Sequence, residues 1–378
     1  VQSVALRLIT EREAEIEIFK PQEFWTIDTK LITNKAESFS ARLTHIEGKR
    51  LDKFGLKNET EALKAVALIE NSNLSVTKID QKRVKRNPQP PFTTSTLQQE
   101  ASRKLNFGAS RTMQLAQRLY EGIEMGGDTV GLITYMRTDG VQMSQEAINA
   151  ARQVIKAQFG GNFVPDQQRI YKTKAKNAQE AHEAIRPTDM TRLPEKVRSY
   201  LDADQFRLYD LIWKRSIASQ MASAELDQTT VKIEATDKAT ELRANGSIIA
   251  FEGFLKVYKE DQDDPSVEGS ADDDRILPSM SEGEVVERKE TTPDQHFTQP
   301  PPRCSEASLV KRLEELGIGR PSTYASIMQV LQERNYVRLD KKRFIPEARG
   351  RLVTSFLSNF FTKYIQYDFT ADLEAELD

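Results

Sequence analysis

Hydrophobic residues change their spacing several times along the chain, and each change predicts a new element. Apolar residues at helical spacing predict a helix over residues 1–20. Residues 24–46 alternate apolar and polar side chains, as half-buried strands do, and the alternation returns at 74–86. Between these strands, Asn58 and Glu61 have the spacing of a capping box and predict a second helix. The chain is therefore expected to begin with a helix and to continue into a β region.

Helical spacing dominates the middle of the chain, at residues 94–222. Apolar residues on one face predict a helix at 145–159, and a short apolar run at 130–134 predicts a buried strand. Strand spacing returns at 226–260 and again at 284–290. The economical interpretation is one β domain, discontinuous in sequence, with a helical block inserted between its two halves.

Length and composition narrow the class of protein. A chain of 378 residues suggests two or three domains, and no apolar run approaches the ~18 residues that a membrane-spanning helix needs. The single cysteine, Cys304, excludes an internal disulfide framework and a zinc ribbon, and the composition fits the cytoplasm. Val1 opens directly into an amphipathic pattern without a signal peptide, so we expect a piece of a longer protein.

Charge bears on whether this chain binds nucleic acid. The formal net charge is -3, whereas a protein that binds DNA by electrostatics alone is basic. Any positive surface is therefore local, and one cluster lies in a predicted strand at Lys82, Arg83, Lys85 and Arg86. The dense acidic stretch at 260–275 has few apolar residues and predicts a loop, which would not hold carboxylates rigidly around a metal ion.

The first of three polar motifs follows the predicted strand at 130–134. It contains Tyr135, Arg137 and Asp139, which share one side for as long as the strand continues. A phenol with its usual pKa of ~10 is a weak nucleophile near neutral pH. A neighbouring guanidinium favours the phenolate, and it can also bind a phosphate and stabilise charge in a transition state. The structural alternative is a tyrosine that caps a core beside a surface Arg–Asp pair.

The second motif runs from Asn177 to Pro187 and predicts a helix. Asn177 and Glu180 have capping-box spacing, and the proline ends the helix. His182 and Arg186 would then share one face, which can approach a phosphodiester. A lone histidine is usually structural, so the motif alone does not assign its role.

The third motif predicts a helix-turn-helix unit with a hairpin wing at 336–345. Its turn contains Gly317 and Gly319. The apolar residues at helical spacing are Leu309, Leu313 and Leu316 in the first helix and Tyr324, Ile327 and Leu331 in the second. Polar residues that can bind phosphate gather at the N-terminus of the second helix: Arg320, Ser322 and Thr323. The same geometry is a common packing unit, so the motif alone leaves DNA contact open.

These motifs, in this order, resemble the bacterial type IA DNA topoisomerases. Residues 131–139 match the family's active-site tyrosine segment, 177–187 match its histidine segment, and 318–325 match its Ile-Gly-Arg-Pro-Ser-Thr-Tyr-Ala segment. Further matches at 91–97 and 1–5 extend the resemblance over almost the whole chain.

The resemblance implies roles for single residues. The implied catalytic residues are Tyr135, Arg137, Asp139 and His182. Tyr135 would attack DNA and form a phosphotyrosine with the 5′ phosphate, and His182 would contact the scissile phosphate or help to move protons. The implied DNA-binding residues are Val1, Gln2, Arg137, Arg320, Ser322, Thr323 and Arg334. Met136 fits topoisomerase I rather than topoisomerase III, whereas Gly140 and Cys304 stand where the family often has Ser and Tyr.

The resemblance also implies a fold and an activity. The fold is a multidomain α+β ring with a helical base at 1–37 and 296–378, a discontinuous β arch at 38–93 and 223–295, and an inserted helical domain at 94–222 that carries the catalytic tyrosine. The activity is ATP-independent relaxation of negatively supercoiled DNA by cutting one strand, passing another and resealing.

The implied cofactor is Mg²⁺, held by a separate N-terminal domain, so this chain alone is expected to bind no metal and not to relax DNA. Its partner would be DNA, preferably single-stranded, in the cytoplasm at the bacterial nucleoid, with no membrane and no ATP. The alternatives are topoisomerase III, the topoisomerase half of reverse gyrase, and a non-enzymatic helix-turn-helix scaffold that only binds DNA.

Overall fold

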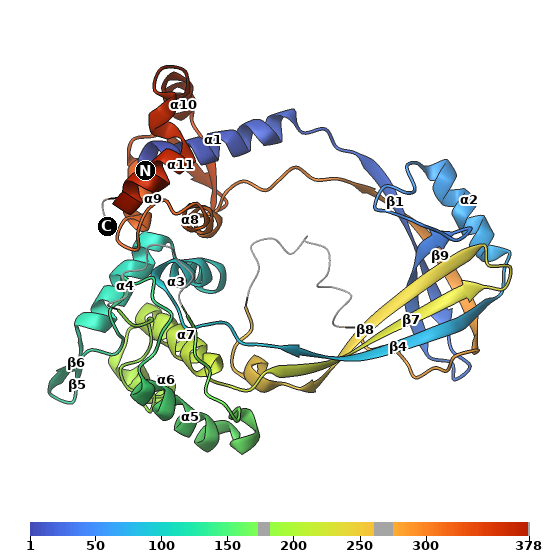
Figure 1. The fold of residues 1–378 in the computed structure, drawn as a ribbon, viewed down its shortest axis with the longest axis horizontal. Helices are drawn as coiled ribbons and strands as arrows, with labels where there is room; N and C mark the ends of the chain where they lie inside the picture. The colour runs from blue at the N-terminus through green and yellow to red at the C-terminus, as the bar shows by residue number, and fades with distance from the viewer. Residues whose placement is uncertain (173–181, 261–274, 377–378) are drawn as a thin grey trace.

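The chain folds into a ring. The computed structural model describes residues 1–172, 182–260 and 275–376, and its ribbon joins a helical base, a β arch and a second helical block (Figure 1). The base and the helical block lie next to each other, and the arch lies on the opposite side of the ring. The predicted α+β ring with a discontinuous arch and an inserted helical block is confirmed. Within the described ranges, no helix is long and apolar enough to cross a membrane.

The base brings the two ends of the described chain together around one apolar core. Its elements are α1 (Gln2–Ile18), α8 (Glu306–Glu315), α9 (Tyr324–Glu333), β10 (Val337–Asp340), β11 (Arg343–Pro346), α10 (Ala348–Phe360) and α11 (Tyr367–Glu376). The predicted helix-turn-helix is confirmed as α8 and α9, with positive φ at Gly317 and Gly319 in the turn. The paired strands β10 and β11 are the predicted wing. Leu6 and Ile9 of α1 pack in the same core as Leu313 of α8.

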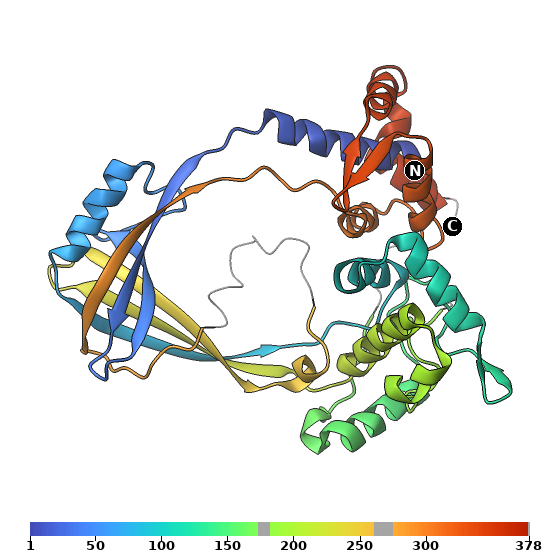
Figure 2. The ribbon, with the colours of Figure 1, turned by 180° about the vertical axis from the view of Figure 1, so that it is seen from behind.

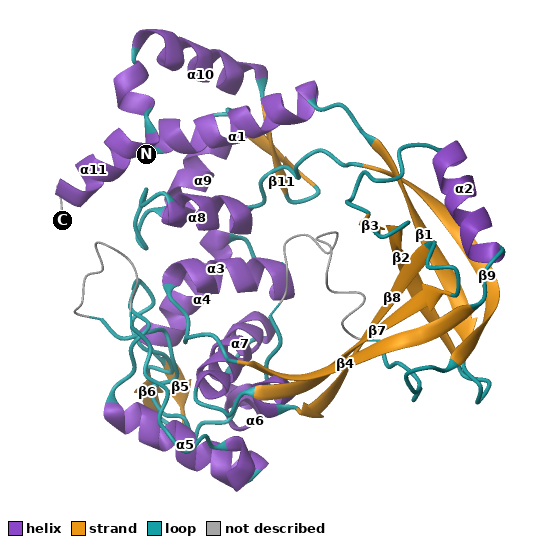
Figure 3. Cartoon of the chain, turned by 45° about the vertical axis from the view of Figure 1, so that its right-hand side comes forward, coloured by secondary structure: helices purple, strands orange, loops and turns teal. Residues whose placement is uncertain are grey.

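The arch is an antiparallel sheet that closes on itself. Its strands are β1 (Glu23–Ile32), β2 (Ser38–Ile46), β3 (Lys49–Arg50), β4 (Leu74–Arg86), β7 (Ala224–Ala235), β8 (Thr240–Phe251) and β9 (Val285–Phe297). The hydrogen-bonded order is β1-β9-β4-β7-β8-β2-β3, and β1 also pairs with β2. This extra pairing gives β1 and β2 a neighbour on both sides and removes the open edge on which a sheet would otherwise aggregate. The helix α2 (Glu59–Glu70) packs against β1 and β9 (Figure 3).

The hydrogen bonds of β1 place the boundary between the base and the arch earlier in the chain than the sequence predicts. The sequence separates the base from the arch after residue 37, whereas β1 pairs with β9 from Glu23 to Ile32 and also with β2. A strand belongs to the sheet that satisfies its peptide groups, so the arch begins at β1 rather than at residue 38.

The predicted cap of α2 is confirmed, because the Asn58 side chain accepts the Glu61 amide.

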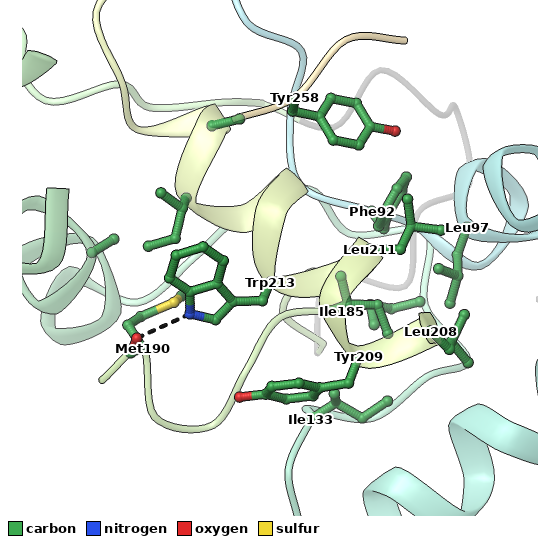
Figure 4. Packing of buried hydrophobic residues seen from close by; sticks show 14 of the residues in the cluster. Phe92, Leu97, Ile133, Ile185, Met190, Leu208, Tyr209, Leu211, Trp213 and Tyr258 are labelled. Carbon is green, nitrogen blue, oxygen red and sulfur yellow. Dashed lines mark hydrogen bonds between the residues drawn. The ribbon is translucent and has the colours of Figure 1, made fainter. Parts of the chain in front are cut away.

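The second helical block is joined to the arch by the strands β4, β7 and β8 (Figure 1). Its elements are α3 (Thr94–Glu100), α4 (Ala109–Glu121), β5 (Ile123–Met125), β6 (Asp128–Val130), α5 (Gln145–Phe159), α6 (Pro194–Val197) and α7 (Ala203–Ser219). The predicted helix at 145–159 is confirmed as α5. In its core, the indole N–H of Trp213 donates to the carbonyl oxygen of Met190 at 3.1 Å (Figure 4). Phe92 and Tyr258, from the segments that lead to the arch, belong to the same core.

The ring closes where the base meets the second helical block, and opposite views show the same contact (Figures 1 and 2). The Ser95 hydroxyl donates to a carboxylate oxygen of Glu314 at 2.6 Å, and the Ala109 amide donates to Glu306 at 2.7 Å. The N-cap residue of α4 is Gly108, which has no side chain to cap the helix. Glu306 therefore caps α4 from the base, across the join between the two bodies.

The segment at 131–140 is not the buried strand that its apolar run predicts. The short strand β6 ends at Val130, and Ile133 makes an isolated bridge to Pro187. Side-chain hydroxyls and neighbouring loops bind its peptide groups instead of a strand ladder. The strand prediction at 130–134 is therefore wrong, because tertiary hydrogen bonds override the local pattern.

Glycines at both ends of this segment let it approach other parts of the chain closely. A Cβ built on Gly131 would lie 2.7 Å from the carbonyl oxygen of Tyr120. A Cβ on Gly140 would lie 2.3 Å from the carbonyl oxygen of His182. Both distances are far shorter than a van der Waals contact, and both involve backbone atoms. A side chain at either position would therefore displace the neighbouring segment.

We expect Gly140→Ala to lower the free energy of unfolding of the second helical block by about 1–3 kcal/mol, because overpacking at backbone forces a shift. The matched control is Gly161→Ala, since a Cβ at Gly161 meets nothing within 4 Å. Thermal unfolding of both variants, followed by circular dichroism, measures the difference. Equal melting temperatures for the two variants would contradict the close contact at Gly140.

Candidate active site and nucleic-acid interface

Tyr135 lies between two aromatic side chains. Its ring centroid is 5.4 Å from that of Tyr120, in an edge-on arrangement, and 5.2 Å from that of His182. Tyr135 is half-buried, whereas His182 is exposed and Tyr120 is 41% exposed. The structure therefore brings two of the predicted catalytic residues into direct contact, although they are far apart in sequence. The phenol is held by protein on two sides and keeps part of its surface accessible.

Thr134 fixes the segment before Tyr135 to the segment after His182. Its amide donates to the carbonyl oxygen of Arg186 at 2.9 Å, and its hydroxyl accepts the amide of the same residue at 3.0 Å. The hydroxyl also donates to the carbonyl oxygen of Ala184 at 2.7 Å. These bonds hold the backbone segments that carry the Tyr135 phenol and the His182 imidazole in a fixed relative position.

The same bonds overturn a predicted helix. The described part of the stretch at 177–187, residues 182–187, forms no helix and makes two isolated β-bridges, and residues 177–181 lie outside the described part of the chain. Peptide groups that bond to Thr134 and its neighbours cannot also form helical hydrogen bonds. The predicted helical face shared by His182 and Arg186 is therefore wrong, and Arg186 pairs instead with a glutamate of its own segment at 2.6 Å.

Arg137 and Asp139 lie in different surroundings, because the strand that would have aligned them with Tyr135 is absent. Arg137 is exposed, and its guanidinium makes no hydrogen bond or ion pair with residues 1–172, 182–260 or 275–376. Asp139 is half-buried and lines a cavity of about 480 Å³ together with Arg320 of the base. Asp139 therefore connects the tyrosine segment with the predicted phosphate site, whereas Arg137 is available to a ligand.

The cavity lies between the helical block and the base. The acidic residues that line it are Asp139, Glu314, Glu315, Asp368 and Asp372. Across the described residues, however, no group of three or more His, Cys, Asp or Glu side chains is placed to hold a metal ion.

Arg320 is held by Glu374 of α11. One guanidinium nitrogen lies 3.2 Å from the Glu374 carboxylate, and another donates to the Glu374 carbonyl oxygen at 2.7 Å. The same carboxylate accepts the amide of Gly319 at 2.6 Å. Two further predicted DNA-binding residues, Val1 and Gln2, are exposed at the start of α1.

The remaining predicted DNA-binding residues lie at the two ends of α9. Ser322 is exposed before the helix begins, and the Thr323 hydroxyl accepts the Arg320 amide at 2.8 Å. Arg334 follows the last turn and is exposed, and its guanidinium has no hydrogen-bond or ion-pair partner in the part of the chain that the structure describes. A helix of 10 residues is about 15 Å long. These side chains therefore suit an extended strand with several phosphates rather than one phosphate group.

The basic cluster on β4 is neutralised by its neighbour in the sheet. Arg83 binds both carboxylate oxygens of Asp227, at 2.8 and 2.9 Å, and Lys85 lies 3.2 Å from Glu225. Each of these two acidic residues on β7 lies directly opposite, in the sheet register, the basic residue that it binds. At these two positions the cluster supports the sheet and does not offer free positive charge to DNA.

Sequence reasoning missed Tyr120 and Glu374. Tyr120 reaches Tyr135 because the hairpin of β5 and β6 folds the chain back, and helical spacing within α4 carries no sign of that return. Glu374 lies in α11, where nothing in the local pattern distinguishes it from a solvent-exposed acid. Cys304 is one of the two departures from the family pattern. Burial raises the pKa of its thiol, so the thiol stays protonated near neutral pH.

Comparisons with known proteins agree with this arrangement. A family described as DNA topoisomerase matches residues 1–378. A relative from Rickettsia bellii named DNA topoisomerase 1 is 55% identical over the whole chain, which covers 47% of that relative's length. A relative of the same name from Zymomonas mobilis is 53% identical over the whole chain, which covers 30% of its length. The chain thus spans about half the length of the Rickettsia relative.

The solved structure of full-length topoisomerase I from Thermotoga maritima is 34% identical, with a TM-score of 0.83. It matches 100% of this chain, which covers 58% of that protein. Fold, motifs and relatives therefore agree over the full length of the sequence, and the chain belongs to the bacterial type IA DNA topoisomerases.

Proposed function

We propose that this chain carries the DNA-cleaving residues of a protein that relaxes negatively supercoiled DNA without ATP. One observation carries the proposal: Tyr135 is half-buried against His182, and Arg137, two residues further on, is exposed and unpaired among the described residues. A purely structural tyrosine needs neither neighbour. A phenol beside an imidazole and a free guanidinium has the groups that nucleophilic attack on a phosphate requires.

In the proposed reaction, the Tyr135 hydroxyl oxygen attacks the scissile phosphorus, and the bond from phosphorus to O3′ breaks. The phenol loses its proton and the departing O3′ gains one, so one phosphate ester replaces another and bond energy is conserved. Resealing is the reverse reaction, which is why no nucleotide is consumed. Arg137 would bind the non-bridging oxygens and stabilise their charge. His182 would contact the phosphate or exchange the proton.

The proposed strand passage opens the ring where α8 meets α3 and α4. That contact includes the Glu314–Ser95 and Glu306–Ala109 hydrogen bonds, whose partners water can satisfy when the ring opens. The closed sheet of the arch would stay intact and act as the hinge about which the second helical block rotates. The second helical block would then move away with Tyr135 and the attached DNA end.

Single-stranded DNA is the proposed ligand, in the cytoplasm at the bacterial nucleoid. The exposed Ser322 and Arg334 and the partly exposed Arg320 can bind successive phosphates of a flexible strand. The net charge of -3 gives little long-range attraction for the denser charge of a duplex. Among the alternatives, a scaffold that only binds DNA would not need the contact between Tyr135 and His182. Relatives named DNA topoisomerase 1 favour topoisomerase I over topoisomerase III.

In the full-length protein, we expect Tyr135→Phe to abolish the covalent DNA adduct and to leave DNA binding nearly unchanged, because the variant loses the nucleophile and keeps the ring. The matched control is Tyr200→Phe, which alters a tyrosine that is 46% exposed and has no part in the site. Denaturing gels of a labelled oligonucleotide detect the adduct. An adduct of normal yield from Tyr135→Phe would contradict the assignment of Tyr135 as the nucleophile. A wild-type protein that binds DNA without any adduct would favour a non-enzymatic DNA-binding scaffold.

The chain of 378 residues is expected to bind single-stranded DNA weakly, but more tightly than duplex. Removing one phosphate contact lowers the slope of log affinity against log salt by roughly 0.7 for a single strand. We expect this loss in Arg320→Ala and not in Arg198→Ala, whose side chain is 64% exposed and distant from the proposed interface. Titrations at several salt concentrations provide the test, and an unchanged slope for Arg320→Ala would remove this residue from the interface.

By itself, the same chain is expected not to relax plasmid DNA in Mg²⁺. The family resemblance assigns the metal-binding carboxylates to a separate domain, and one lost charge-stabilising group typically costs ~3 kcal/mol of transition-state stabilisation. Gel electrophoresis of negatively supercoiled plasmid, with and without the metal-binding domain of a relative added separately, measures the effect. Relaxation by the chain of 378 residues alone would show that its catalytic groups are complete and would contradict this division.

A further inference from the structure

Thr94, in the first turn of α3, is bound to the segment that carries Arg137. Its side chain is fully buried, with 0% of its surface exposed. Its hydroxyl donates to the carbonyl oxygen of Met136 at 2.7 Å and accepts the amide of Thr138 at 2.8 Å. Its own amide donates to the carbonyl oxygen of Thr138, also at 2.8 Å. One residue therefore binds the chain immediately before and immediately after Arg137.

The Thr94 hydroxyl is not needed to cap its own helix. The capping box of α3 is formed by Thr93 and Thr96, whose hydroxyls accept each other's amides. A buried hydroxyl without a partner is costly, so the geometry of Thr94 depends on the segment that it binds. Among the hydroxyls of this turn, the Thr94 hydroxyl therefore serves the active-site segment.

The Met136 side chain packs in the core of the helical block, and the hydrogen bonds that the described residues make to the peptide groups of Met136 and Thr138 come from Thr94. The Arg137 segment is not part of a strand ladder, and its guanidinium has no partner among the described residues. The next bond along the chain continues from Thr138, whose hydroxyl accepts the Gly140 amide at 2.9 Å. Gly140 lies in close contact with the backbone of His182. The bonds of Thr94 therefore reach the arginine and the histidine segment through one continuous path.

We propose that Thr94 is a positioning residue for cleavage, which holds the backbone at 136–138 so that Arg137 meets the phosphate beside Tyr135. The inference rests on the proposed function of these two residues. Thr94 does not touch DNA; it acts through the segment that it binds. A misplacement of about 1 Å at a reacting group can cost on the order of 100-fold in rate.

The test compares Thr94→Val, which keeps the shape and removes the hydroxyl, with Thr94→Ser, which keeps the hydroxyl. The matched control is Thr112→Val: Thr112 is also 0% exposed in the same helical block, and among the described residues its hydroxyl donates to the carbonyl oxygen of Gly108, the N-cap residue of α4. In the full-length protein, single-turnover cleavage of an oligonucleotide should fall on the order of 10- to 100-fold in Thr94→Val. The Kd for the same oligonucleotide should stay within about twofold, and Thr94→Ser and Thr112→Val should cleave normally.

A double-mutant cycle separates positioning from general damage. If Thr94 acts through Arg137, Thr94→Val should have no further effect on cleavage in the Arg137→Ala background. Equal cleavage by Thr94→Val and wild type, or the same loss in Thr112→Val, would overturn the inference. So would a Thr94→Ser protein that folds and cleaves as poorly as Thr94→Val.

Amide hydrogen exchange gives a readout that does not depend on activity. In Thr94→Val, exchange of the Thr138 amide should rise on the order of tenfold, because its acceptor is gone, and Thr94→Ser should retain protection. A wild-type protein that forms no covalent adduct would refute the proposed function. Unchanged exchange at Thr138 in Thr94→Val would refute the positioning role, and the two failures are therefore distinguishable.

Discussion

Polar contacts of the base hold the ring closed. Glu314 binds the Ser95 hydroxyl, Glu306 caps α4 through the Ala109 amide, and Lys342 in the turn of the wing binds the side chain of Asn106. The apolar cores of the base, the arch and the helical block are otherwise separate, with Ala109 as a small apolar contribution of α4 to the core of the base. Since water can replace such bonds at modest cost, the join separates more easily than any of the three cores unfolds.

The active-site segment is organised in the opposite way. Its exposed group Arg137 lies in a segment whose neighbours are held by threonine hydrogen bonds. Thr134 ties the segment to the loop after His182, and Thr94 ties it to α3. A flexible side chain on a rigid backbone can search for a phosphate without moving the nucleophile, which is the arrangement that precise positioning requires.

Periodicity predicted the elements that bury one face, such as α5, the helix-turn-helix and the strands of the arch, because burial and spacing are coupled in them. It failed at 130–134 and at 182–187, where peptide groups bind hydroxyls and loops from distant parts of the chain. The pairing of Tyr135 with His182 followed from the family resemblance, not from spacing. The hold of Glu374 on Arg320 joins residues from separate elements, and no local pattern encodes it.

The arch has a mechanical consequence through β4. This strand has 13 residues and runs from the closed sheet to the helical block. At about 3.3 Å per residue it forms a lever of about 43 Å, so a tilt of about 10° at the arch moves the far end by roughly 7 Å. A hydrogen bond does not survive such a displacement. Both bonds of α8 would then break in a single small rotation.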